Sequence, residues 1–312
     1  MKQTNQVRQV VMPLLAAFIW GTAFVAQDMC AEVIEPMTFN AVRSYVAVVV
    51  LLIIIWVFGK LSKDKPQRTA EEKEYDRKQL LIGGICCGTA LAVAANFQQA
   101  GMGAGTDAGK AGFITALYIV LVPICGLFLK KRVSLPVWIS VVIAVVALYL
   151  LCITGDFTLQ LGDLLLLLCA LFFTVHILVI DHFTATVDGM KLSCVQFLVA
   201  AIWSTIGMAI FEHPDWNAIL SCALPILYVG IFSSGVAYTL QILAQKGSNP
   251  TVVTLLLSME SVFAVISGAI ILHQRMSVRE YLGCVLMLIA VILAQIPFPL
   301  KKNTGAVEKA QK

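Results

Sequence analysis

Apolar residues along this chain come in long runs that short polar segments separate. A helix needs about 20 apolar residues to cross the hydrocarbon core of a bilayer, and ten runs reach that length. They lie near residues 9–28, 36–58, 80–100, 111–129, 134–153, 162–180, 190–211, 222–244, 251–272 and 279–297. None alternates apolar and polar positions as a barrel strand does. The pattern predicts an all-α integral membrane protein with ten transmembrane helices. The lipid bilayer is therefore an expected partner of the protein.

The composition of the chain supports this prediction and excludes other classes. Hydrophobic residues make up 59% of the 312 residues and charged residues only 13%, against about 25% charged residues in soluble domains. The mean hydropathy is +0.88. A soluble enzyme of this size would need more polar residues to cover its surface. The formal net charge of +4 is too small to suggest binding to nucleic acid.

Lysine and arginine residues are concentrated on one side of the predicted membrane. With the N-terminus in the cytoplasm, 18 of the 22 fall on the cytoplasmic side, and the outer side holds only Lys110, Arg275 and Arg279. Positive residues collect on the cytoplasmic side of membrane proteins. We therefore expect a plasma-membrane protein with both termini, including a polar tail over 298–312, in the cytoplasm. Lys110 could attract anions to the outer mouth or extend its ammonium group to the interface.

The two halves of the chain are similar to each other. Residues 14–17 match 167–170 at an offset of 153, and 94–150 match 237–293 at an offset of 143 without a gap. This similarity predicts a first repeat over 1–153 and a second over 162–297. Each repeat holds five spans, so the second enters the membrane from the opposite side. Such inverted repeats are typical of secondary transporters, which bind substrate between the repeats near the midplane.

Several motifs resemble those of a known family. They are WGT at 20–22, TFNAVR at 38–43, AGFITALYIVLVP at 111–123, FSSGVAYTLQ at 232–241 and MESVFA at 259–264. Together they resemble the EamA-like branch of the drug/metabolite transporter superfamily. The resemblance covers nearly the whole chain and implies two inverted five-helix repeats, a central cavity and the movement of small metabolites. It also suggests efflux of amino acids or related compounds, with protons as a coupling ion.

Two charged residues lie inside predicted spans. Glu260 is ten residues into the ninth run and Arg43 is seven residues into the second. Charges at such depth are costly and usually face the interior of the helix bundle. Glu260 could bind a cationic group or a proton, and Arg43 could set the charge preference of the site. The two could equally form a buried ion pair, and the sequence leaves both interpretations open.

Polar residues inside other spans extend the candidate site. Gln98 and Gln241 occupy equivalent positions in the two repeats, so inversion predicts them at opposite ends of the cavity. Hydrogen bonding between helices is the simpler role for each. His176 could relay protons or could be a histidine that is hydrogen-bonded within the bundle.

Aromatic residues complete the candidate set. Trp20, Tyr118 and Tyr238 could shape a pocket and stack on an aromatic or cationic substrate. Packing is the commoner role for an aromatic residue in a span. Trp20 and Tyr238 are favoured because small neighbours, Gly21 and Gly235, would leave room beside them.

The chain offers no sign of enzyme chemistry. It lacks the Gly-Lys-Ser/Thr, HExxH and GxSxG patterns that mark phosphate loops, zinc hydrolases and serine hydrolases. Its nine cysteines have no zinc-type spacing and are expected to be small packing residues. We therefore expect a transporter of a small molecule, monomeric or homodimeric, without catalytic residues, cofactor or metal. An intramembrane enzyme or a receptor is the alternative.

Overall fold

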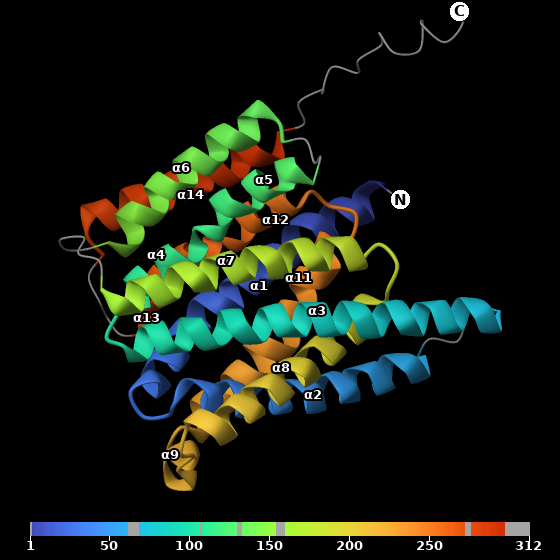
Figure 1. Ribbon diagram of the computed structural model, residues 1–312. Helices are drawn as coiled ribbons and strands as arrows, with labels where there is room; N and C mark the ends of the chain where they lie inside the picture. Colours follow the sequence, from blue (N-terminus) through green and yellow to red (C-terminus); the bar gives the residue numbers. More distant parts are fainter. Residues whose placement is uncertain are drawn as a thin grey trace, which may run out of the picture.

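The computed structural model describes residues 2–61, 69–106, 108–129, 133–153, 160–271 and 276–296. Within these ranges every regular element is a helix, and ten helical segments are long and apolar enough to span a membrane, as predicted (Figure 1). The elements are α1 (Lys2–Ala31), α2 (Pro36–Leu61), α3 (Ala70–Gly103), α4 (Ala108–Ala116), α5 (Tyr118–Phe128), α6 (Leu135–Cys152), α7 (Leu161–Phe183), α8 (Gly189–Phe211), α9 (Trp216–Ser221), α10 (Ala223–Tyr228), η1 (Val229–Ala237), α11 (Tyr238–Gln245), α12 (Pro250–Leu257), α13 (Met259–Ile271) and α14 (Val278–Gln295). The expected tail at 298–312 lies outside the described residues.

The third span is longer than its apolar run predicts. It starts at Ala70 instead of residue 80, because Thr69 caps its N-terminus. The Thr69 hydroxyl accepts a hydrogen bond from the Glu72 amide (3.2 Å), and the Glu72 carboxylate accepts one from the Thr69 amide (3.0 Å). Such a reciprocal capping box satisfies two amide groups that have no partner within the helix. The charged first turns of α3 therefore extend beyond the neighbouring helices (Figure 1).

Two spans are interrupted near their middle. The fourth span changes from α4 to α5 at Leu117, and the ninth changes from α12 to α13 at Ser258. At the first break the Leu117 amide bonds to the Ile114 carbonyl (3.2 Å), and at the second the Ser258 hydroxyl donates to the Leu255 carbonyl (2.8 Å). The fourth and ninth spans correspond in the two repeats. Broken helices of this kind are common where transporters bind their substrates.

The eighth span contains a π-helix, η1, between α10 and α11. The Tyr238 amide bonds to the Ser233 carbonyl, five residues earlier. The wider turn leaves the Ser233 carbonyl able to accept a second donor, the indole nitrogen of Trp20 at 3.4 Å. Short π-helical turns occur frequently at functional sites.

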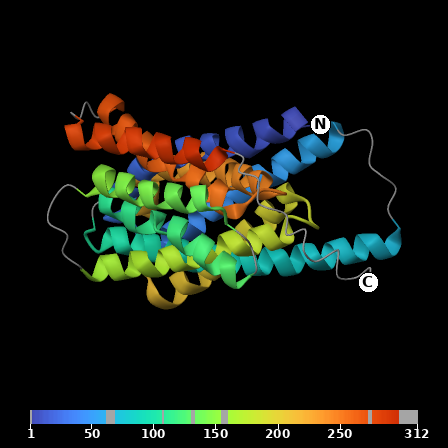
Figure 2. The ribbon, with the colours of Figure 1, turned by 90° about the horizontal axis from the view of Figure 1, so that it is seen from above.

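The two halves of the chain are interleaved. The most extensive helix pairs are α3 with α7, α3 with α8, α2 with α8, α1 with α13 and α6 with α14, and each joins the first half to the second. In Figure 1 the α6–α14 pair lies at one edge of the bundle, and α2, α3 and α8 lie at the other; Figure 2 views the bundle from the α6–α14 edge. The repeats are therefore sequence units that share one packed bundle. Rigid rocking of one whole repeat against the other would break all of these contacts.

One end of the bundle carries polar contacts between the two halves. We name it the outer end, after the side that the charge distribution predicts; α1 ends and α2 begins there. The Glu212 carboxylate, after α8, accepts hydrogen bonds from the amides of Met37 and Thr38 (both 2.7 Å) and from the Thr38 hydroxyl (2.8 Å). In return, the Glu35 carboxylate accepts from the His213 amide (2.9 Å). An anion at a helix N-terminus is favourable because the first amides of the helix have no other partner.

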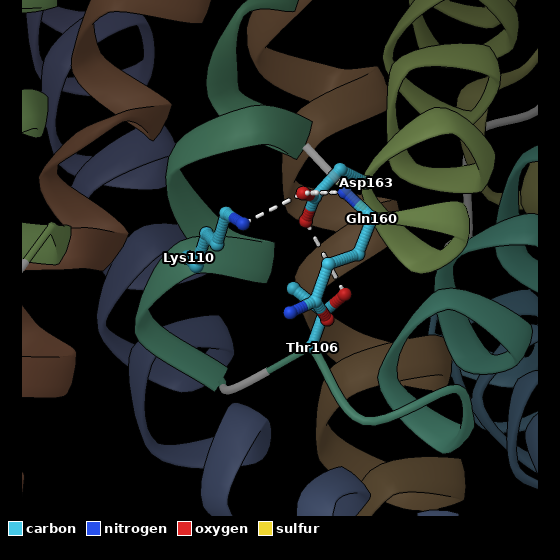
Figure 3. A network of polar contacts seen from close by, with 4 residues as sticks. All are labelled: Thr106, Lys110, Gln160 and Asp163. Atoms are coloured by element: carbon cyan, nitrogen blue, oxygen red, sulfur yellow. Dashed lines mark hydrogen bonds and ion pairs between the residues drawn. The ribbon is translucent and has the colours of Figure 1, made fainter. Parts of the chain in front are cut away.

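Lys110 takes part in a second polar contact at this end. Its ammonium group lies 2.6 Å from the fully buried carboxylate of Asp163, at the start of α7. The same carboxylate accepts hydrogen bonds from the Thr106 hydroxyl (3.3 Å) and from the Gln160 amide (2.8 Å) (Figure 3). Lys110 is thus part of an ion pair that joins the two halves, instead of reaching toward anions at an outer mouth.

Replacing Glu212 with alanine is expected to weaken the outer end. The three donors on Met37 and Thr38 would lose their common acceptor. Hydrogen bonds to charged groups contribute about 1.5–3 kcal/mol, so we expect the variant to lose about 2 kcal/mol of stability. The midpoint of thermal unfolding in detergent measures this loss. Glu32→Ala, an exposed carboxylate close by, is the matched control, and equal midpoints for the two variants would contradict the prediction.

Candidate functional site

A cavity lies inside the helix bundle, and seven of the ten spans contribute to it. Its lining residues are Trp20, Phe24 and Gln27 (α1), Arg43 (α2), Gln98 (α3), Thr115 (α4), Tyr118 (α5), Phe173 and Ile177 (α7), Ser233 (η1), Tyr238 and Gln241 (α11), Leu257 (α12) and Glu260 (α13). The volume open to the centre of a water molecule is about 40 Å³, which is room for a few waters. Seven of the eight candidates from the sequence line this cavity, and the exception is His176.

Glu260 reaches the cavity from one of the two helix breaks. It is the third residue after Leu257, where α12 ends, and only 5% of its side chain is exposed. The hydroxyl of Tyr118, the first residue of α5, donates to its Oε1 at 3.4 Å. Both broken spans therefore place a residue just beyond their break, Tyr118 or Glu260, in the same cavity. A carboxyl group with a single long hydrogen bond has capacity to accept further donors.

Arg43 lines the same cavity and has no carboxylate partner among the residues that the structure describes. Its Nη1 donates to Gln27 Oε1 at 3.2 Å, its guanidinium lies 5.5 Å from the Phe39 ring centroid, and its buried Nε has no hydrogen-bond partner. In the described part of the chain no ion pair joins it to Glu260, so the pairing considered from the sequence is absent. A buried guanidinium whose N–H groups are not all hydrogen-bonded can bind a carboxylate through two parallel hydrogen bonds.

Aromatic rings form one wall of the cavity. The rings of Trp20 and Tyr238 meet edge to face, with centroids 4.8 Å apart. Tyr238 also contacts the rings of Phe197 (5.4 Å) and His176 (6.0 Å). These contacts hold Tyr238 from three helices, α1, α7 and α8. The expected placement of Trp20, Tyr118 and Tyr238 around one pocket agrees with this geometry.

The expectation that a small neighbour leaves room beside these aromatic residues is wrong for Gly21. A Cβ on Gly21 would lie 2.6 Å from the backbone oxygen of Glu260, because α1 and α13 cross there in direct contact. At Gly235 an added Cβ would meet only ordinary contacts, 3.4 Å from Cγ1 of Val50 on α2, so nothing contradicts the expectation there. Small residues in membrane proteins let helices approach closely. In this protein that approach fills the space and positions the backbone of Glu260.

The remaining polar candidates have different surroundings. Gln98 donates to the Thr115 hydroxyl at 3.4 Å, whereas Oε1 of Gln241 is buried without a hydrogen-bond partner. His176 is fully buried, and its Nε2 lies 3.0 Å from Oε1 of Gln196. Gln196 is the repeat equivalent of Arg43. Each repeat therefore contains a polar pair between its first two helices, Gln27 with Arg43 and His176 with Gln196. His176 is thus hydrogen-bonded within the bundle, as the simpler interpretation of the sequence expects.

Several lining residues were not among the candidates. The polar ones are Gln27, Thr115 and Ser233, and the apolar ones are Phe24, Phe173, Ile177 and Leu257. Trp20, Phe24 and Gln27 are spaced by four and three residues, so they share one helix face. That spacing could have identified Phe24 and Gln27 from the sequence once Trp20 was chosen. Among the described residues no three His, Cys, Asp or Glu side chains are grouped as metal ligands, and the absence of a cofactor stays a prediction.

Comparisons with known proteins agree with one another. The EamA-like transporter family matches the chain twice, over residues 8–153 and 160–295. An uncharacterized transporter of Archaeoglobus fulgidus is 29% identical over 288 residues, which are 90% of this chain and 84% of that protein. The uncharacterized transporter YwfM of Bacillus subtilis is 23% identical over 94% of this chain and 95% of its own. One solved crystal structure matches with a TM-score of 0.75 at 16% identity, over 92% of this chain and 96% of that chain, and shows the same fold.

Proposed function

Because this chain belongs to the EamA-like transporter family and is a multi-pass membrane transporter, we propose that it exports a small zwitterionic metabolite, such as an amino acid. The export takes place across the plasma membrane, with both termini in the cytoplasm. The direction follows the motif resemblance, and the orientation follows the distribution of lysine and arginine residues.

The observation that supports this substrate class is the separation of two opposite charges in one cavity. Arg43 and Glu260 both line it, and each is hydrogen-bonded to a neutral residue, Gln27 and Tyr118 respectively. A zwitterion carries a carboxylate that matches the guanidinium and an ammonium group that matches the carboxylate. The rings of Trp20 and Tyr238 offer faces for the rest of the substrate and for cation–π contact with its ammonium group.

The mechanism we propose is alternating access around this cavity. The cavity holds only a few waters in this conformation, so a metabolite can occupy it only when the lining helices move. The breaks at Leu117 and Ser258 are the points where the fourth and ninth spans can bend. Glu260 follows one break and contacts the residue after the other, so bending would move the acidic group. Release of the substrate ammonium would leave the carboxylate to bind a proton, which gives a route to proton antiport.

The substrate class is tested by removing the guanidinium. Purified protein in detergent is heated with an amino acid or with the amine that lacks only its carboxylate. A ligand at about 100 times its Kd stabilises the folded state by about 2.7 kcal/mol. We expect the amino acid to stabilise the native protein more than the amine does. The Arg43→Gln variant should bind the amino acid about 10- to 100-fold more weakly, which corresponds to about 1.5–3 kcal/mol for a charge-assisted contact.

Controls separate recognition from folding. The affinity for the amine should change little in Arg43→Gln, and Arg77→Gln, an exposed arginine on α3, should behave as the native protein does. Equal losses for amino acid and amine would contradict carboxylate recognition by Arg43. Flux of the bound compound into proteoliposomes tests transport itself, whereas conversion of the compound without flux would favour an enzyme.

A further inference from the structure

Two cysteines that lie far apart in the sequence meet at the outer end of the bundle. Cys30 is in the last turn of α1, and Cys222 lies between α9 and α10. Their thiols are neighbours that interact with each other, and both residues belong to one small apolar cluster with Ile34, Phe39 and Ile226. Cys30 is fully buried and Cys222 is 6% exposed. Both are free thiols in this structure.

The thiol pair lies at the outer ends of two spans that line the cavity. On α1, Cys30 follows Trp20, Phe24 and Gln27 on the same helix face, one turn beyond Gln27. Cys222 directly precedes the eighth span, whose Ser233, Tyr238 and Gln241 line the cavity. A bond between the two cysteines would therefore join the outer ends of two cavity walls.

The geometry points to Cys30 and Cys222 as a disulfide-forming pair that, when oxidised, fixes α1 to the eighth span and arrests transport. This inference rests on the proposed alternating access, because arrest requires the two walls to separate during the cycle. The predicted location of the pair, on the outer side of the membrane, is compatible with disulfide formation. The charge distribution places this end outside the cytoplasm, where disulfides form and persist.

The co-reactant is a small disulfide, written XS–SX. The thiolate of the less buried residue, Cys222, attacks one sulfur of XS–SX, so that its S–S bond breaks and one XS⁻ leaves. The thiolate of Cys30 then attacks the Cys222 sulfur of the mixed disulfide and releases the second XS⁻. Two electrons pass from the cysteines to XS–SX, and the two thiol protons end on two molecules of XSH. Both cysteines are almost completely covered, so exchange waits until the outer ends of the helices separate.

The test uses the full chain in proteoliposomes with oxidised glutathione as XS–SX. Unreduced peptide mass spectrometry should find Cys30 linked to Cys222 with the loss of two hydrogen atoms. Flux of a radiolabelled amino acid mixture should fall in proportion to the linked fraction, about tenfold when nine-tenths of the protein is linked. Dithiothreitol should restore it. Cys30→Ser and Cys222→Ser should keep their flux in oxidised glutathione, while Cys125→Ser, a cysteine of α5 outside this cluster, should respond as the native protein does.

Each result bears on a distinct part of the inference. Absence of the linked peptide overturns the disulfide site, and full flux with the link present overturns the arrest. Absence of flux in the reduced protein contradicts the proposed function alone, because the linked peptide is measured without substrate. In that case amide hydrogen exchange at the outer ends of α1 and the eighth span measures the restraint: slower exchange after oxidation supports it, and unchanged exchange overturns it.

Discussion

Replacing Glu260 with glutamine is expected to abolish coupled transport while the protein still folds. Glutamine has nearly the same shape and can still accept the hydrogen bond of Tyr118, which lies 3.4 Å from the carboxylate. It cannot carry a negative charge or take up a proton. Losing the contact between a substrate ammonium and a buried carboxylate should cost about 1.5–3 kcal/mol, so flux should fall about 10- to 100-fold.

The measurement is flux into proteoliposomes, with and without a pH gradient. If Glu260 binds the substrate ammonium, both gradient-driven flux and substrate binding are lost in Glu260→Gln. If it only carries the proton, exchange of internal for external substrate persists while the gradient no longer drives accumulation. Glu260→Asp, which keeps the charge, should recover part of the activity. Glu74→Gln, an exposed carboxylate on α3, should have no effect. Native gradient-driven flux in Glu260→Gln would refute a role in either binding or coupling.

Replacing Gly21 with alanine is expected to have the largest effect on the packing around the site. The new Cβ would lie 2.6 Å from the Glu260 carbonyl oxygen and 2.8 Å from both the Ala264 nitrogen and the Phe263 Cβ. All three atoms are backbone or Cβ atoms, which can move only with α13 itself. Overpacking of this kind costs about 1–3 kcal/mol, whereas alanine would gain about 0.8–1 kcal/mol over glycine in an open helical site.

A matched glycine tells these contributions apart. Gly59, near the end of α2, has no atom within 4 Å of its would-be Cβ, so Gly59→Ala should leave the unfolding midpoint unchanged or raise it. Gly21→Ala should lower the midpoint and also reduce substrate binding, because α13 carries Glu260. Similar midpoints for both variants would show that α1 and α13 do not cross as closely as described.

The positions of the spans could be predicted from the sequence because the bilayer imposes a local rule. Each span needs about 20 apolar residues whatever it packs against, and ten runs satisfy that rule. The charged candidates could be predicted for the same reason: Glu260 and Arg43 are conspicuous in an apolar run, and a charge at that depth faces the protein interior. The boundaries were less accurate where a polar cap extends a helix, as Thr69 does for α3.

The partners of the candidate residues could not be predicted in this way. Arg43 bonds to Gln27 and Glu260 bonds to Tyr118, although opposite charges alone favour an ion pair. His176 is held by Gln196 behind the cavity wall. No glycine or proline stands at the helix breaks at Leu117 and Ser258, so the sequence does not indicate where these two spans are interrupted. Each of these features depends on how helices from both halves of the chain are arranged around the cavity.

The sequence by itself thus determined the helical membrane fold, the two-repeat organisation and the residue types available for a site, because lipid solvation acts on each segment separately. The tertiary structure alone decided which of those residues share the cavity, that Gly21 brings α1 against Glu260, and that Cys30 meets Cys222. These contacts join residues that lie far apart in the sequence. Trp20 meets Tyr238 at the aromatic wall of the cavity, and Gly21 meets Glu260, 239 positions away, where α1 and α13 cross. They depend on close packing between helices, which the order of residues along one helix does not encode.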